Sequence, residues 1–230
     1  MCDHPVNRRQ ALVGISSGVV ALLLSRLSLA SADAAPGVSP DKALAMLKEG
    51  NARFLAGKSE HPNLTIKRIT ETSGGQHPFA TFISCSDSRV PVEEVFDRGI
   101  GDLFVIRVAG NVADTDEIGT AEYGSGHLGV SLIVVMGHTK CGAVTAVVTG
   151  AKVGGSIPKL VDNIIPAAER AKAKGLKDDA LILEATKENV RQSISDLTAH
   201  SEELAHMVKE GKIKIVGAMY HTESGRVDWL

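Results

Sequence analysis

Short apolar runs alternate with amphipathic stretches along most of the chain, and this alternation predicts strands separated by helices. The short runs predict four buried strands, at residues 79–84, 103–108, 131–136 and 212–220. Helical spacing predicts helices over residues 39–55, 117–127, 143–148, 158–174 and 179–209, the last of them broken once. Strands that alternate with helices favour an α/β fold with a mainly parallel central sheet flanked by helices.

Capping signals mark where the first helix begins and ends. Ser39 is a favourable N-cap, Pro40 suits the first helical position and Asp41 places an acid in the first turn. Gly57 is expected to stop this helix. The segment 61–78 is polar and predicted to be a loop, whereas residues 91–97 are expected to form a helical turn.

The first 34 residues differ from the rest of the chain. Arg8 and Arg9 form a basic start, residues 11–24 are an uninterrupted run of apolar and small residues, and small residues follow at 30–35. This order is typical of a secretory signal peptide, and the apolar run is shorter than the roughly 20 residues that a membrane span needs. We expect cleavage after Ala34, which leaves residues 35–230 as one domain without stable membrane insertion. The alternative is a retained N-terminal anchor or a buried helix.

The basic pair suggests an export route. Arg8 and Arg9, followed by Gln10 and Ala11, resemble a twin-arginine signal, although Ala11 stands where a bulky aromatic residue is usual. The alternative is the basic start of a general export signal. Either route predicts a periplasmic or secreted protein.

Composition narrows the class of protein. With 43% hydrophobic and 23% charged residues, the chain is ordinary for a globular protein. The formal net charge is −2, with no long run of one sign, so nucleic acid is not expected as a partner. Three cysteines cannot form a disulfide framework, and Cys2 would leave with the signal peptide.

The two other cysteines directly follow predicted strands. Cys85 comes after the strand at 79–84, and His138 and Cys141 come after the strand at 131–136. Ligands bind at the carboxyl ends of strands in open α/β sheets, so these side chains are expected to converge there. Two cysteines and a histidine form a known ligand set for catalytic zinc, and thiolates favour zinc over Mg²⁺.

Two other interpretations of these cysteines remain open at this point. They could be inert buried thiols, or they could form a disulfide in an oxidising compartment. Asp87 and Arg89 lie beside Cys85 in the sequence, and a charged pair next to buried thiols favours a metal site.

The segments that contain these residues resemble those of the β-class carbonic anhydrases. Cys85-Ser86-Asp87-Ser88-Arg89 is similar to their first metal motif, and residues 137–142, Gly-His-Thr-Lys-Cys-Gly, are similar to their second. Further similar segments lie at residues 104–107, 109–111, 122–124 and 217–220. The resemblance covers residues 39–230 and implies a carbonic anhydrase-like catalytic domain over 35–230.

The resemblance implies roles for five side chains. Cys85, His138 and Cys141 would be the ligands of Zn²⁺, and Asp87 with Arg89 would be the catalytic dyad. Were the dyad to separate, Asp87 would become a fourth zinc ligand in a closed state.

The resemblance also implies the substrate pocket. By motif position, Gln76, Phe104 and Tyr123 match residues that line it, some of them reaching it from a partner subunit, and Ala109 stands where some members carry Val at the pocket wall. A homodimer or higher homo-oligomer is therefore expected. Position 108 is Val where many members have Asn, and Phe82 replaces a Trp that marks members with an inhibitory bicarbonate site.

The implied function is zinc-dependent, reversible hydration of carbon dioxide to bicarbonate and a proton through a zinc-bound hydroxide. One alternative is a carbonyl sulfide or carbon disulfide hydrolase on the same fold. Another is a non-catalytic zinc or redox dithiol protein. His77, His127 and Tyr123 are candidates for a proton shuttle, and the sequence does not single one out.

Overall fold

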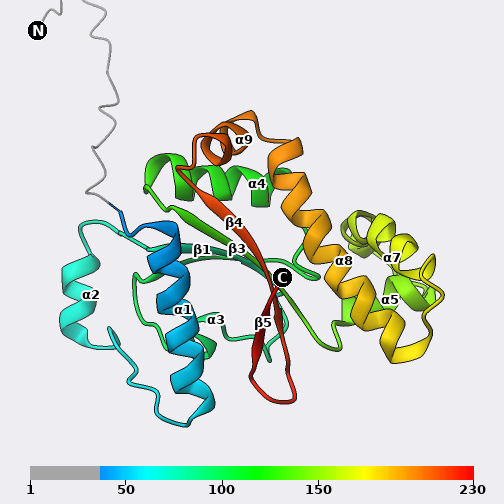
Figure 1. Cartoon of the computed structure of the whole chain (residues 1–230), viewed down its shortest axis with the longest axis horizontal. Coiled ribbons are helices and arrows are strands. Elements are labelled where there is room, and N and C mark those ends of the chain that lie inside the picture. The colour runs from blue at the N-terminus through cyan, green and yellow to red at the C-terminus, as the bar shows by residue number, and fades with distance from the viewer. Residues whose placement is uncertain (1–36) are drawn as a thin grey trace, which may run out of the picture. The chain divides into compact units, whose positions relative to one another are not determined.

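A five-stranded sheet forms the centre of the computed structural model, which describes residues 37–230 (Figure 1). The sheet order is β2-β1-β3-β4-β5, and the first four strands run parallel whereas β5 pairs antiparallel with β4. The strands are β1 (Ala80–Ser84), β2 (Leu103–Arg107), β3 (Leu132–His138), β4 (Lys214–Tyr220) and β5 (Val227–Trp229). This confirms the predicted α/β fold with a mainly parallel sheet. The signal peptide predicted for residues 1–34 lies outside the described residues.

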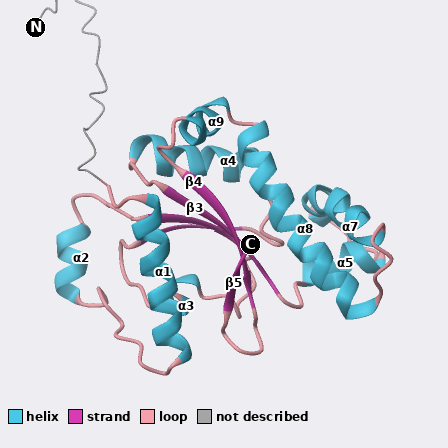
Figure 2. Ribbon diagram, in the orientation of Figure 1, coloured by secondary structure: helices cyan, strands magenta, loops and turns pink. Residues whose placement is uncertain are grey.

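Helices lie on both sides of the sheet (Figure 2). They are α1 (Pro40–Leu55), α2 (Ile66–Thr72), α3 (Val92–Val95), α4 (Thr115–Glu122), α5 (Gly142–Thr149), α6 (Ile157–Val161), α7 (Ile165–Lys172), α8 (Asp178–Ala199) and α9 (Glu202–Lys209). A π-helical turn, η1 (Tyr123–His127), extends α4, and a 3-10 turn, η2 (Asp162–Ile164), separates α6 from α7. Within residues 37–230, no helix combines the length and apolar character needed to cross a lipid bilayer.

Alternation along the strands divides the sheet residues between two apolar cores. Phe82 of β1 packs in the core beneath α1 and α3, whereas the next residue, Ile83, packs in the core beneath α4, α8 and α9. Strand residues alternate in this way because successive side chains point to opposite faces. A parallel sheet covered on both faces has continuously apolar strands, which explains why β1 and β3 are buried throughout.

Helix α1 begins and packs as its sequence predicts. The Ser39 side chain accepts a hydrogen bond from the Lys42 amide, and Ala43 and Leu47 are fully buried against the sheet and α3. Gly50 lets the backbone of α1 approach the end of α3 closely, because a Cβ there would lie 1.8 Å from the Phe96 carbonyl oxygen. The apolar stripe of α1 is therefore covered within the chain.

Helix α2 corrects the expectation of a loop over residues 61–78. The Thr65 side chain caps it by accepting from the Arg68 amide at 3.1 Å, but none of its residues is buried against the described part of the chain. Without a buried face there is no apolar periodicity to detect. Ile66 and Ile69 consequently remain 79% and 50% exposed.

Candidate metal centre

The parallel register brings the three predicted ligands to one edge of the sheet. β1 and β3 are neighbours, with Ser84 opposite Met136, so the residues that follow both strands lie side by side. Cys85 directly follows β1, and His138 is the last residue of β3, which extends two residues beyond its predicted end. Cys141 is the N-cap of α5, so it lies three residues after His138, directly before the first residue of the helix.

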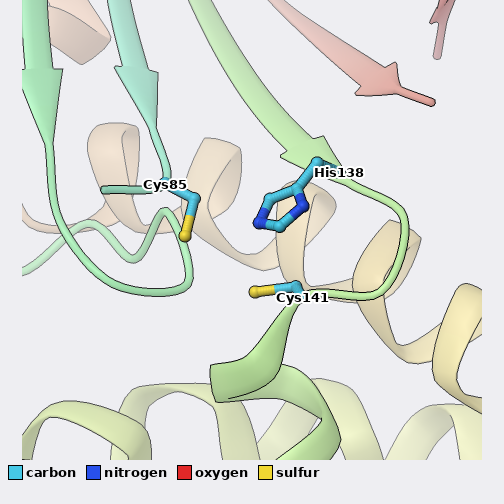
Figure 3. Close-up of side chains that lie close together, drawn as sticks. All are labelled: Cys85, His138 and Cys141. Atoms are coloured by element: carbon cyan, nitrogen blue, oxygen red, sulfur yellow. The ribbon is translucent and has the colours of Figure 1, made fainter. Parts of the chain in front are cut away.

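The three side chains point toward one another (Figure 3). One donor atom from each of Cys85, His138 and Cys141 lies within 4.8 Å of the others, and all three residues are buried. Both cysteines are free thiols, so the structure does not contain the disulfide considered above. Apolar side chains from the segment between α5 and α8, among them Val144 and Ile164, pack with the two thiols in one buried cluster.

The hydrogen bonding of His138 leaves one ring nitrogen available. Nδ1 lies 2.9 Å from the carbonyl oxygen of Thr139, a contact that requires the proton on Nδ1. Nε2 then carries the lone pair, and it is buried without a hydrogen-bond partner among residues 37–230. A buried acceptor without a partner is costly, and a metal ion facing two thiols would satisfy it. The donor set therefore fits zinc.

Local contacts favour negative charge on Cys85. The Gly110 amide donates to Cys85 Sγ at 3.3 Å. Hydrogen bonding between the two thiols lowers the pKa of Cys85 and raises the pKa of Cys141. A proton held between the two sulfurs therefore stays on Cys141 and leaves Cys85 as the thiolate.

Asp87 and Arg89 form a two-point ion pair at the rim of the centre. Arg89 Nε donates to Asp87 Oδ1 at 3.0 Å, and Arg89 Nη2 donates to Asp87 Oδ2 at 2.7 Å. Hydrogen bonding to Arg89 holds the pKa of the Asp87 carboxyl well below its usual range. Asp87 Oδ2 also lies 3.8 Å from His138 Nε2, so the carboxylate faces the buried nitrogen.

Arg107 supports this rim, a contact that sequence reasoning missed. Its Nε donates to the Cys85 carbonyl at 3.1 Å, and its Nη2 donates to the Asp87 carbonyl at 2.6 Å. The parallel pairing of Ser84 with Arg107 explains this placement, because Arg107 ends the strand beside β1. In the sequence, Arg107 stands out only as part of the similar segment 104–107, one residue before the predicted strand end.

The predicted pocket residues are not all close to the thiols of the same chain. Phe104 pairs with Thr81, which at about 3.3 Å per residue is about 13 Å along the strand from Cys85. The rings of Tyr123 and Phe104 lie 6.1 Å apart, and the ring of His127, a shuttle candidate, lies 5.3 Å from that of Tyr123.

The two other predicted pocket residues lie in loops. Gln76 is exposed in the loop before β1, and Ala109 precedes Gly110 in the loop after β2. Ala109 is thus adjacent to the amide that contacts Cys85, whereas the described chain does not place Gln76 beside the thiols. His77, another of the three shuttle candidates, is exposed next to Gln76.

Comparison with known proteins identifies the family. A family model described as carbonic anhydrase matches residues 80–227. Carbonic anhydrase 2 of Mycobacterium tuberculosis is 36% identical over 195 residues, covering 83% of this chain and 93% of that protein. A carbonic anhydrase of Mycolicibacterium smegmatis is 37% identical over 197 residues, covering 84% and 94%.

Solved structures agree with the sequence relatives. A β-carbonic anhydrase of Aspergillus fumigatus superposes with a TM-score of 0.66 at 30% identity, covering 83% of this chain and 89% of that one. A β-carbonic anhydrase of Coccomyxa gives a TM-score of 0.66 at 25% identity, covering 85% and 87%. These names favour neither the carbon disulfide hydrolase nor the dithiol protein considered above. The chain belongs to the β-carbonic anhydrase family, enzymes that interconvert carbon dioxide and bicarbonate.

Proposed function

We propose that Cys85, His138 and Cys141 hold a zinc ion at which this chain hydrates carbon dioxide reversibly. The observation that carries the proposal is the convergence of three buried donor atoms within 4.8 Å, one of them a histidine nitrogen without a partner in the described chain. A zinc ion with three protein ligands and an open position activates a water molecule at neutral pH.

Asp87 orients the nucleophile. Its carboxylate faces the ligand set, 3.8 Å from His138 Nε2, and it is positioned to accept a hydrogen bond from a water molecule there. A carboxylate that accepts this hydrogen bond orients the oxygen of the water molecule, so that one of its lone pairs faces the substrate. The side chain is only 19% exposed, so bulk water competes weakly for the same contact.

Arg89 keeps Asp87 in its working state. The two-point pair holds the carboxyl ionised, and it occupies both oxygens so that Asp87 does not turn inward to become a ligand itself. Loss of the pair would free Asp87 to close the site. The geometry described here has the pair intact.

A homodimer or larger assembly is part of the proposal. Tyr123 is 47% exposed, and it packs with Phe104 at a distance from the thiols of its own chain. Both are therefore available to line the pocket of a second copy. The exposed apolar residues of α2 provide a contact surface, whereas the apolar stripe of α1 is covered by the chain itself.

The ligand variants test the zinc assignment. Cys85→Ser, His138→Ala and Cys141→Ser should each lose zinc and carbon dioxide hydration together, because each removes one of three protein ligands. Metal analysis and stopped-flow hydration on the same preparations measure both. Full zinc occupancy with normal turnover would remove that residue from the ligand set.

Export is a separate proposal, and it rests only on the sequence of the first 34 residues. Export by the twin-arginine route would let the protein fold and bind zinc before it meets an oxidising compartment. Replacing Arg8 and Arg9 by Lys keeps the charge, and it should leave active enzyme in the cytoplasm. Normal periplasmic enzyme in cell fractions would reject the twin-arginine assignment.

A further inference from the structure

The turn between β4 and β5 holds the loop that joins two of the proposed ligands. Thr139 follows His138, and its hydroxyl donates to Glu223 Oε2 at 2.8 Å. The same hydroxyl accepts from the Thr222 amide at 3.0 Å. One side chain of the loop is thus tied to the turn from both sides, 83 and 84 residues away in sequence.

The main chain of this loop orients two residues of the site. The Thr139 carbonyl lies 2.9 Å from His138 Nδ1, and the Lys140 carbonyl accepts from Arg89 Nη2 at 3.2 Å. Lys140 has a φ of 56°, a left-handed conformation that a lysine rarely adopts without support from its surroundings. The directions of these carbonyls therefore depend on how the loop is held.

The Glu223 side chain is largely exposed, so its contact with Thr139 does not serve the packing of the core. Its side chain is 54% exposed. It is placed by His221, whose Nδ1 lies 3.4 Å from Glu223 Oε1 and whose Nε2 lies 2.8 Å from Asp228 Oδ2. The chain of contacts thus runs from β5 through His221 and Glu223 to Thr139.

We propose that Thr139 and Glu223 are positioning residues of the metal centre: through the carbonyls of residues 139 and 140 they fix the ring of His138 and the guanidinium of Arg89. This inference rests on the proposed zinc site. Partners that orient a ligating histidine raise the affinity for the metal, and their loss typically costs about 10- to 100-fold in affinity or activity.

A matched pair of variants at position 139 tests the hydroxyl. Thr139→Val keeps the shape and removes the hydrogen bonds, whereas Thr139→Ser keeps the hydroxyl. We expect zinc release into excess chelator to be about tenfold faster or more in Thr139→Val, and Thr139→Ser to restore most of the retention. In the cobalt(II)-substituted proteins, the absorption bands should shift in the Val variant and stay near wild type in the Ser variant.

A second pair tests the carboxylate. Glu223→Ala should release zinc faster and lower kcat more than it changes KM, because the site is misaligned rather than blocked. Glu210→Ala is the control. Glu210 is also an exposed carboxylate with basic partners, Lys212 at 2.7 Å and His206 at 3.2 Å, and it precedes β4 at the opposite edge of the sheet.

The outcomes separate this inference from the zinc assignment. Wild-type protein that binds no stoichiometric zinc would overturn the proposed site, and the positioning role with it. Wild-type protein that binds zinc tightly, with Thr139→Val and Glu223→Ala matching it in zinc release and cobalt spectrum, would overturn the positioning role alone. A loss of thermal stability without a change in either readout would assign the contacts to folding and also overturn it.

Discussion

Arg89 donates a hydrogen bond to each carboxylate oxygen of Asp87. Replacing one partner at a time tests the catalytic role proposed for each side chain. We expect Asp87→Asn to keep zinc and to lower kcat/KM by about a hundredfold or more, because the amide is a poorer acceptor for the nucleophile. Arg89→Ala should also keep zinc and lose turnover, because the freed Asp87 closes the site. Metal analysis together with hydration rates measures both effects. Zinc loss as severe as in the cysteine variants would contradict this role and show that Asp87 and Arg89 are needed to hold the metal.

Residue chemistry explains which side chains could be predicted. Cysteine and histidine are uncommon in this sequence, so Cys85, His138 and Cys141 stand out. Their positions after apolar runs indicate that they converge at the carboxyl ends of the strands. Gly110 and Arg107 carry no such signal. The contact of Gly110 depends on the path of the main chain after β2, and the contacts of Arg107 depend on the pairing of β2 with β1. The same is true of the contact between Thr139 and Glu223.

At the level of elements, Asp97 joins α1, the loop after it and the end of α3. Its buried carboxylate accepts from Arg53 Nε at 2.6 Å and from the amides of Glu60 and His61 at 3.0 and 2.9 Å. Burial alone would raise the pKa of this carboxyl, but these hydrogen bonds outweigh burial and lower it.

We expect Asp97→Asn to lower the free energy of unfolding by about 3 kcal/mol, because it breaks a buried ion pair. The folded-state pKa of Asp97 is lowered, so its contribution is complete above the unfolded-state value of about 3.9 and is lost as the pH falls through the folded-state pKa. Denaturant unfolding at pH 7 and below pH 4 measures this.

Asp41→Asn is the control for Asp97→Asn, since Asp41 is 87% exposed and, among residues 37–230, forms an ion pair only with Lys214 at the surface. Its effect should stay within about 1 kcal/mol. An equal loss in both variants, or a loss in Asp97→Asn that does not diminish at low pH, would contradict the role given to Asp97.

Element boundaries were predictable where a buried face or a cap marks them. Helix α1 follows from Ser39 and its apolar stripe, whereas α2 has no buried face and was predicted as a loop. The helix predicted over 117–127 becomes α4 followed by a π-helical turn. Within that turn, Gly124 lies close to Thr81 and Phe104, a tertiary contact that local periodicity does not report.

At the scale of the whole molecule, α2 presents apolar side chains that the described chain leaves uncovered. Replacing Ile66 and Ile69 by Lys should shift the protein toward smaller species and raise the subunit dissociation constant about tenfold or more. Neither side chain is buried in the monomer, so circular dichroism should be unchanged. Sedimentation of the wild type as a fully active monomer at assay concentration would reject the assembly.

The alternation of strands and helices was enough to predict the α/β architecture, because a parallel sheet requires helical crossovers. The complete pocket was harder to predict. Phe104 and Tyr123 were identified by resemblance, and their own chain places Phe104 about 13 Å along the strand from Cys85. Whether they line the pocket of a second chain depends on the assembly rather than on the local sequence.

The most direct measurement is a zinc titration of metal-free protein, followed by stopped-flow hydration of carbon dioxide. We predict no turnover without metal, then a linear rise that saturates at one zinc per chain, and no rise in Cys85→Ser over the same range. Turnover in the metal-free protein, or an unchanged titration in the Cys85→Ser variant, would contradict a zinc centre built from Cys85, His138 and Cys141.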